Sequence, residues 1–502
     1  MRPLVETSYG KLRGKEDDGI MVFRGIPFAA PPVGDLRWRP PQPAETWSGE
    51  KDASEFGGSA PQGRFPGGVG DLIGIPSERT SEDCLYLNVW TPGLEGRRPV
   101  MVWIHGGGNT VGSGTQPRIN GKHLAGRGDV VMVTTNYRLG ALGFLHAPEL
   151  GASGNEALLD QTAALRWVRN EIANFGGDPA NVTVFGQSAG GFDIAQLMGL
   201  PAAKGCFDKA IPMSGSLTVP VPKENAERTT ARLAERFGGM EKLRSVQYEE
   251  ILKYQIELLE RTDRRDRFAP VLDGKVILED AAVPLGKGTQ TRGMPLLIGN
   301  TLDEFALFTV PGGTLDDLDD ERLSGMARRI FGENTTSAMD VYREARESRG
   351  QAATPLDIWN AMVTDQIFRM PAIRTAELHS SHTPQTWMYL FDYISPAYDG
   401  RLGACHSIDI PFIWGTYMVE KMKVFCGEGP IVEDLSERMM DIYLAFARTG
   451  NPRTDDIPEW PVYDTESRAT MRMGKKFRVE EKPMEEERLF WEQYDMRPLQ
   501  NE

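Results

Sequence analysis

Cysteine is scarce in this sequence, with 4 residues in a chain of 502. Cys84, Cys206, Cys405 and Cys426 are widely scattered, and no two of them have the CxxC spacing of common zinc sites. Such a pattern argues against a disulfide scaffold and against a structural metal. We therefore expect free, buried thiols, no metal and no organic cofactor.

Long apolar runs are missing as well. No stretch approaches the ~18 apolar residues that a membrane-spanning helix needs. The first residues also lack the apolar segment of a secretion signal, so the encoded start is expected to be the mature one. The expected location is the cytoplasm.

An excess of basic residues is a third absence. Lys and Arg total 56 against 71 Asp and Glu, which gives a formal net charge of −15. Nucleic acids and anionic membranes are bound mainly through an excess of Lys and Arg, so we expect neither as a partner. The composition leaves the oligomeric state undetermined.

Repeats and low-complexity linkers are absent too, and we expect residues 1–502 to form one domain. Short, nearly continuous apolar runs are present instead, as is typical of strands buried on both faces of a parallel sheet. These runs are residues 99–104, 129–133, 182–185, 209–211, 295–298 and 387–391.

Helical signals lie between these runs. Apolar residues recur at helical spacing over 158–172, and Gly176 and Gly177 end that helix. The alternation of strand, helix and strand predicts a doubly wound α/β fold. The sequence from about 311 to 384 is charged and mostly helical in pattern. It predicts an insertion that covers a functional site.

The run 182–185 leads directly into the pattern Gly-x-Ser-x-Gly at residues 186–190, and a helix is predicted to begin near Gly191. A serine on such a strand-to-helix turn projects its hydroxyl outward, and the flanking glycines avoid collisions. The N-terminus of the following helix favours negative charge. Ser188 is therefore the predicted nucleophile of an acyl-transfer reaction.

The run 99–104 ends in His105 and three glycines, residues 106–108. Acyl transfer needs N–H donors placed where the carbonyl oxygen becomes negative. We predict the backbone amides of Gly107, Gly108 and Ala189 as these donors. His105 itself is expected to be a packed, hydrogen-bonded loop residue.

A serine nucleophile needs a base and an acid, and these follow it along the chain in folds that place the serine on such a strand-to-helix turn. Of the histidines beyond the nucleophile, His379 and His382 lie at a polar helix end and are expected to be exposed. His406 lies in a loop of small residues and is the predicted base. Asp303 and Glu304 both follow the run 295–298, and the pattern alone does not choose between them.

Ordered blocks along nearly the whole chain resemble the type-B carboxylesterase and cholinesterase family. They include residues 23–29, 31–37, 81–88, 136–140, 175–179, 446–452 and 460–461. The resemblance implies an α/β-hydrolase fold, with a mostly parallel central sheet flanked by helices. It also assigns the acid to Glu304 and a structural role to Asp303, and it implies buried ion pairs between Arg37 and Glu82 and between Arg138 and Asp160.

The same resemblance places Ser214 and Asp409 beside the triad. Gln187 stands where cholinesterases have a glutamate, and no Trp lies between Trp47 and Trp90, so a quaternary-ammonium substrate is not expected.

Two further departures from the family pattern concern the pocket and the cysteines. Phe305 replaces a glycine and is expected to narrow the pocket beside the acid, with Phe308 nearby. Ala60 replaces the family's cysteine partner of Cys84, which favours a reducing compartment and a bacterial type of enzyme.

The predicted function is hydrolysis of neutral esters with an apolar acyl or alcohol part, through an acyl-enzyme and without a cofactor. A small-molecule ester is the expected partner. Hydrolysis of carbamates or activated amides by the same triad is the alternative. A non-catalytic binding or adhesion protein, as some members of the family are, is a third hypothesis. The presence of the serine, base, acid and glycines argues against it.

Overall fold

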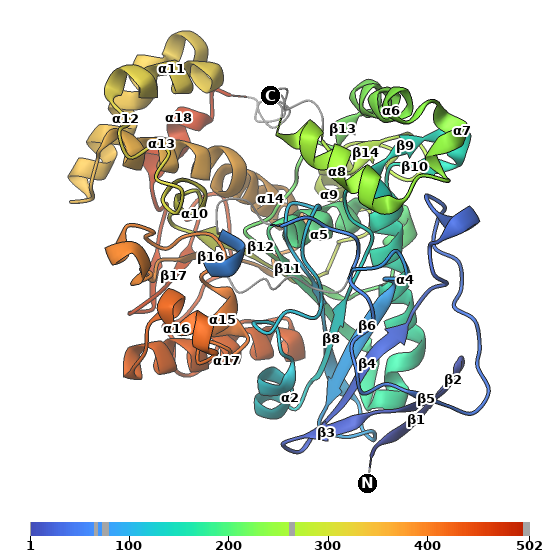
Figure 1. Cartoon of the computed structure of the whole chain (residues 1–502). Helices are drawn as coiled ribbons and strands as arrows, with labels where there is room; N and C mark the ends of the chain where they lie inside the picture. The colour runs from blue at the N-terminus through green and yellow to red at the C-terminus, as the bar shows by residue number, and fades with distance from the viewer. Residues whose placement is uncertain (1, 65–68, 73–79, 261–266, 495–502) are drawn as a thin grey trace.

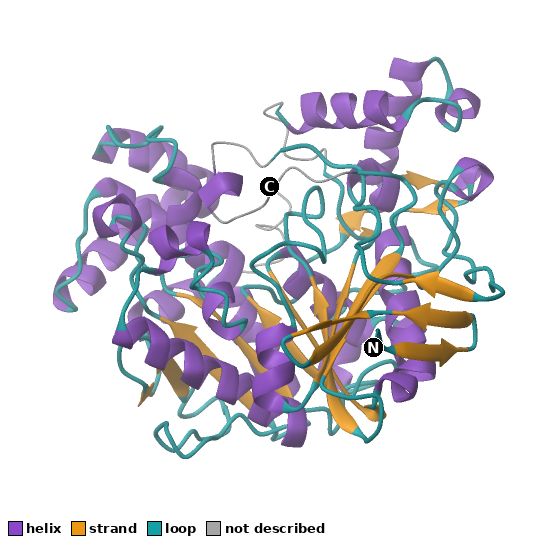
Figure 2. Cartoon of the chain, turned by 60° about the horizontal axis from the view of Figure 1, so that its bottom comes forward, coloured by secondary structure: helices purple, strands orange, loops and turns teal. Residues whose placement is uncertain are grey.

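An 11-stranded mixed sheet crosses the centre of the molecule, with helices packed on both of its faces (Figure 1, Figure 2). The computed structural model describes residues 2–64, 69–72, 80–260 and 267–494. In spatial order the strands are β18 (Arg478–Glu480), β17 (Thr470–Met473), β16 (Thr386–Phe391), β15 (Leu296–Thr301), β12 (Lys209–Met213), β11 (Gly177–Gln187), β7 (Arg98–Ile104), β8 (Val131–Thr135), β6 (Tyr86–Thr91), β4 (Ile20–Pro27) and β3 (Lys15–Asp17).

The middle of this sheet, from β17 to β8, is parallel throughout, and the pairings outside it are antiparallel. All six predicted apolar runs lie in this parallel part. The fold is the predicted doubly wound α/β arrangement. The smaller strands pair apart from it: β1 (Leu4–Thr7), β2 (Gly10–Arg13), β5 (Glu50–Asp52), β9 (His146–Ala147), β10 (Ala152–Ser153), β13 (Val221–Pro222) and β14 (Val271–Leu272).

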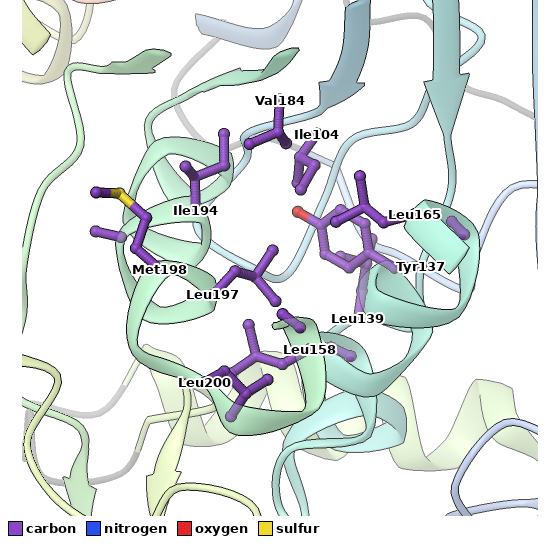
Figure 3. Packing of buried hydrophobic residues seen from close by; sticks show 14 of the residues in the cluster. Ile104, Tyr137, Leu139, Leu158, Leu165, Val184, Ile194, Leu197, Met198 and Leu200 are labelled. Carbon is purple, nitrogen blue, oxygen red and sulfur yellow. The ribbon is translucent and has the colours of Figure 1, made fainter. Parts of the chain in front are cut away.

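Alternate residues of each central strand enter opposite cores, as the pleat of a strand requires. In β7, Val100 and Val102 face one core, while Met101 and Trp103 face the other. Helices α4 (Glu156–Glu171), α5 (Ala189–Gly199) and α14 (Met370–Ser380) cover the first face, and α2 (Lys122–Gly128) and α17 (Pro430–Thr449) cover the second. Figure 3 shows α4 and α5 packing their leucines against the first face.

The remaining helices lie around these layers or at the sheet ends. They are α1 (Val69–Leu72), α3 (Gly140–Phe144), α6 (Lys223–Phe237), α7 (Met240–Leu243), α8 (Tyr248–Leu259), α9 (Ala282–Lys287), α10 (Ala306–Thr309), α11 (Asp320–Phe331), α12 (Thr335–Ser348), α13 (Pro355–Thr364), α15 (Ile410–Ile413), α16 (Glu420–Cys426) and α18 (Glu485–Trp491). A π-helical turn, η7 (Asp365–Arg369), joins α13 to α14. The segment 311–384 is thus helical, as predicted, and its role as a cover stays a prediction.

Several local predictions are confirmed. Helix α4 continues into a short 3-10 turn and ends at Gly176, whose φ of 75° is the left-handed conformation that glycine favours. Helix α5 begins at Ala189, slightly earlier than predicted, because the turn at Ser188 feeds it directly. The two implied ion pairs form, with N–O distances of 2.5 Å for Arg37–Glu82 and 2.7 Å for Arg138–Asp160.

The four cysteines are buried and carry free thiols. Among the residues that the structure describes, every helix is too short or too polar to cross a lipid bilayer.

Candidate active site

The turn between β11 and α5 holds Ser188 in a strained backbone conformation, with φ of 57° and ψ of −127°. Such a conformation is costly for a residue with a side chain, and it persists because the surroundings fix it. A Cβ atom on Gly186 would lie 2.5 Å from the carbonyl oxygen of Ile104, and one on Gly190 only 2.1 Å from it. The two glycines of the pattern are therefore required by the close approach of β7 to this turn.

Residues 105–109, which we call the glycine loop, follow β7 and lie against this turn. A Cβ atom on Gly106 would lie 2.9 Å from Cβ of Ser188. Gly107 and Gly108 have φ values of 122° and 61°, which again favour glycine. The backbone amides of Gly107, Gly108 and Ala189 donate no hydrogen bond to any described residue. The three predicted donors thus lie near Ser188 with their hydrogen-bonding capacity unused.

His105 supports the glycine loop from behind. Its buried ring stacks on that of Tyr137, with centroids 4.4 Å apart, and its Nδ1 lies 2.9 Å from the Gly106 carbonyl oxygen. Burial lowers the pKa of His105 to about 4, so the ring is neutral at physiological pH. His105 is the packed, hydrogen-bonded loop residue that the sequence predicts.

Glu304 and His406 form a buried pair at the carboxyl ends of the neighbouring strands. Oε2 of Glu304 bonds Nδ1 of His406, while Oε1 accepts a hydrogen bond from the Thr301 amide at 2.7 Å. The backbone adds a second link, since the His406 amide donates to the Glu304 carbonyl oxygen at 3.3 Å. Asp303 instead accepts from the Ala404 amide at 2.9 Å and holds the loop that carries the histidine. Glu304, rather than Asp303, therefore makes the contact with the imidazole of His406.

The other ring nitrogen of His406 contacts Gln187. Its Nε2 lies 3.0 Å from Nε2 of Gln187, whose amide N–H can donate to it when Nδ1 carries the imidazole proton. Oγ of Ser188 forms no hydrogen bond with a described residue. The structure thus joins the predicted base to the predicted acid but not to the predicted nucleophile. Hydrogen bonds of this kind often tighten only when a substrate binds.

Ser214 and Asp409 occupy buried positions around this group. Ser214 follows β12, the strand whose last residue accepts the Ser188 amide at 3.0 Å, and its own amide donates to the Gly299 carbonyl oxygen at 2.8 Å. Burial and then the nearby charge of Glu304 raise the pKa of Asp409 to about 7, while Arg118 opposes the shift. Asp409 therefore lies close enough to Glu304 to be affected by its charge.

Aromatic rings surround the imidazole of His406. Phe308 is 40% exposed, its ring centroid lies 5.4 Å from that of His406, and Phe305 packs on Phe308 at 5.5 Å. The sequence did not identify two further members of this group. Phe368 of η7 lies 5.0 Å from His406, and Phe192 of α5 lies 6.1 Å from Phe368. The position of Phe192, four residues after the serine on the same helix, was the available signal.

The predicted exposure of His379 and His382 is wrong for His379, which is fully buried, and His382 is partly buried. Nδ1 of His379 lies 2.7 Å from Oγ1 of Thr386, and Nε2 of His382 lies 2.7 Å from the Leu285 carbonyl oxygen. Burial lowers the pKa of His379 to about 3. Because Thr386 begins β16, these rings lie at the amino end of the strand, the opposite edge of the sheet from His406.

Metal-ligating side chains do not gather in the described part of the chain, where no group of three or more His, Cys, Asp or Glu could hold an ion.

The parallel sheet, its flanking helices and the strained serine at a strand-to-helix turn define the molecule as an α/β-hydrolase. The chain belongs to the carboxylesterase family, whose sequence model matches residues 1–491.

Individual relatives agree with this assignment. The chain is 38% identical to the para-nitrobenzyl esterase of Bacillus subtilis over 97% of both chains. It is 36% identical to the phenmedipham hydrolase of Pseudarthrobacter oxydans, over 94% of this chain and 95% of that one. A crystal structure of a Geobacillus stearothermophilus carboxylesterase superposes with a TM-score of 0.87 at 36% identity, covering 98% of this chain and 100% of that one.

The enzyme class follows from this membership. The chain is a carboxylic-ester hydrolase, and the family does not favour the alternative of carbamate or amide hydrolysis.

Proposed function

We propose that the protein hydrolyses neutral carboxylic esters with an apolar acyl or alcohol part through an acyl-enzyme formed on Ser188. The observation that carries the proposal is the buried Glu304–His406 pair, which lies beside a strained serine whose neighbouring amides are free to donate. These are the parts that acyl transfer requires.

The reaction begins when Nε2 of His406 takes the proton of Ser188 as Oγ attacks the ester carbonyl. Nε2 has one lone pair, so it must lose its contact with the Gln187 amide before it can accept the Ser188 hydroxyl. The amides of Gly107, Gly108 and Ala189 hold the oxyanion, and Glu304 stabilises the imidazolium. His406 then protonates the leaving alcohol, and a water molecule repeats the cycle on the acyl-enzyme.

The rings of Phe305, Phe308 and Phe368 beside the imidazole support an apolar group on the substrate. The name of the Bacillus relative supports an aromatic alcohol part. The expected small-molecule ester thus remains the proposed partner. The cytoplasmic location also stays a proposal, and cell fractionation with an antibody to the protein tests it.

The decisive experiment compares p-nitrophenyl butyrate hydrolysis by the wild type and by Ser188→Ala, each checked for native circular dichroism. Loss of a triad member should lower kcat by about a thousandfold or more. Ser245→Ala, which removes an exposed serine hydroxyl bonded to the Lys242 carbonyl oxygen, serves as the matched control and should keep full activity. A folded but inactive wild type, or an equally active Ser188→Ala, would contradict the proposal.

A further inference from the structure

A buried carboxyl group links α5 to the glycine loop. Asp193 is the single charged residue of α5, and its side chain is fully buried. Its Oδ1 accepts a hydrogen bond from Nδ2 of Asn109 at 3.2 Å, and its Oδ2 accepts one from Nε2 of Gln161 at 2.6 Å. Asp193 therefore connects three elements: the glycine loop, α4 and its own helix.

Asn109 is held on both sides. It directly follows Gly108, has a left-handed φ of 58°, and its carbonyl oxygen accepts a hydrogen bond from the Gly140 amide at 2.7 Å. The backbone of Asn109 is thus tied to the start of α3, and its side chain is tied to α5. Together these bonds fix the end of the glycine loop one residue after a predicted oxyanion donor.

The surroundings of Asp193 make a carboxyl group costly. Asp193 is fully buried, and its helix and α4 pack apolar side chains against each other, among them Ile194 and Leu197 of α5 and Leu158 of α4 (Figure 3). Burial raises the pKa of Asp193 to about 7, and only the two amide hydrogen bonds oppose the shift. A carboxylate accepts hydrogen bonds through both oxygens and donates none, so it suits two amide donors from separate elements.

The geometry points to Asp193 as a positioning residue of the proposed reaction: through Asn109 it holds the glycine loop at a fixed separation from the Ala189 amide. Ala189 begins the helix that carries Asp193, so the two halves of the oxyanion site share one anchor. The inference rests on the proposed function at Ser188. Small displacements of such donors from the developing oxyanion are costly to the rate.

Protonation of Asp193 changes how this anchor is made. A proton on one oxygen turns that oxygen into a donor, so the facing amide keeps its link by turning its own oxygen, Oδ1 of Asn109 or Oε1 of Gln161, toward Asp193. The nearby ionisable groups do not titrate near neutrality: burial raises the pKa of Tyr137 well above 10, and His105, stacked on it, has its pKa lowered to about 4. No other described ionisable group shifts the pKa of Asp193, and this includes the groups on the elements that pack on α5. Those elements include α4, α9, β7, β11 and β12.

Two substitutions separate anchoring from ionisation. Asp193→Ala removes both links and should lower kcat about tenfold to a hundredfold while KM changes less than about threefold, because ground-state binding does not use the oxyanion contacts. Asp193→Asn can keep both links at every pH, since Oδ1 of Asn109 and Oε1 of Gln161 lack partners and either amide can turn to accept its N–H. It should keep kcat within about threefold at pH 8.

The rescue of kcat by Asp193→Asn, with little change of KM in either variant, gives the readout that a merely structural role would not move. A second readout needs no activity: the wild-type free energy of unfolding should decrease as pH rises from 4 through 7, because a carboxyl with a raised folded pKa loses its stabilising contribution over that range. Asp193→Asn should lack this part of the decrease.

Glu156→Gln is the matched control. Glu156 is another buried carboxyl with a raised pKa, and it accepts hydrogen bonds from Ser153 and Gly154, away from the glycine loop. Its replacement should alter stability and leave kcat and KM unchanged. If Asp193→Ala and Asp193→Asn both match the wild type, or if Glu156→Gln lowers kcat as much as Asp193→Ala, the inference is overturned and the proposed function stands. A wild type without esterase activity overturns both.

Discussion

The two halves of the site are built by different means. The half that contains the predicted nucleophile is made of backbone. It consists of Ser188 with its positive φ, the glycine loop and the first amide of α5, packed too closely for a Cβ atom at Gly106, Gly186 or Gly190. The acid–base half is made of side chains, with Glu304, His406, Gln187 and the surrounding rings in contact. A single added Cβ atom therefore produces a steric clash in the backbone half, whereas a substitution in the side-chain half can remove one contact at a time.

The largest effect outside the nucleophile should come from Glu304→Gln in the side-chain half. Both carboxylate oxygens of Glu304 accept hydrogen bonds, one from the Thr301 amide and one from His406, and an amide group has a single acceptor. Loss of the correct imidazole tautomer should lower kcat by about ten-thousandfold. Steady-state kinetics on p-nitrophenyl butyrate measure it.

Asp303→Asn provides the matched comparison, because its remaining carbonyl oxygen can still accept from the Ala404 amide. It should cost less than about tenfold in kcat. A larger loss for Asp303→Asn than for Glu304→Gln would transfer the role of acid to Asp303.

The next largest effect should come from Gly190→Ala in the backbone half. The new Cβ atom would lie 2.1 Å from a backbone oxygen that cannot move without shifting β7. We expect kcat to fall about a hundredfold, as misplaced catalytic groups cause, together with a lower melting temperature. Gly325→Ala is the control, since nothing lies within 4 Å of its Cβ position in the exposed face of α11. It should raise stability by up to about 1 kcal/mol. Native activity and melting temperature for Gly190→Ala would contradict the backbone account.

The smallest effect should come from Phe308→Ala. Its half-exposed ring contacts the imidazole and the proposed substrate pocket, so its loss should raise KM for an aromatic ester several-fold and change kcat less than about threefold. Phe56→Ala is the comparison, because Phe56 is similarly exposed at 38% but packs on Arg24. Equal KM values for the two variants would remove Phe308 from the pocket.

The same contrast explains what the sequence could predict. The half that contains the predicted nucleophile is encoded in two short segments whose glycines are required locally, so Ser188 and the glycine loop could be proposed from spacing alone. The acid–base half is assembled by tertiary packing, and the choice between Asp303 and Glu304 needed the family resemblance. His379 was misjudged because a polar helix end packs on the start of β16. Phe368 could not be found, since it comes from a π-helical turn far along the chain.

Asp193 illustrates the remaining gap. A lone acidic residue within the otherwise uncharged α5, one and a half turns after the serine, was visible in the sequence. Its partners were not, because Asn109 and Gln161 lie 84 and 32 residues away.

The two halves of the site lie far apart in the sequence. This separation determines when a newly synthesised chain can become active. Gln187 and His406 touch but lie 219 residues apart. A ribosome adding 5–20 residues per second therefore needs roughly 10–40 s to deliver the histidine after the serine turn has emerged. The nascent chain carries Ser188 throughout this interval without its proposed base, so we expect esterase activity only after His406 has been added.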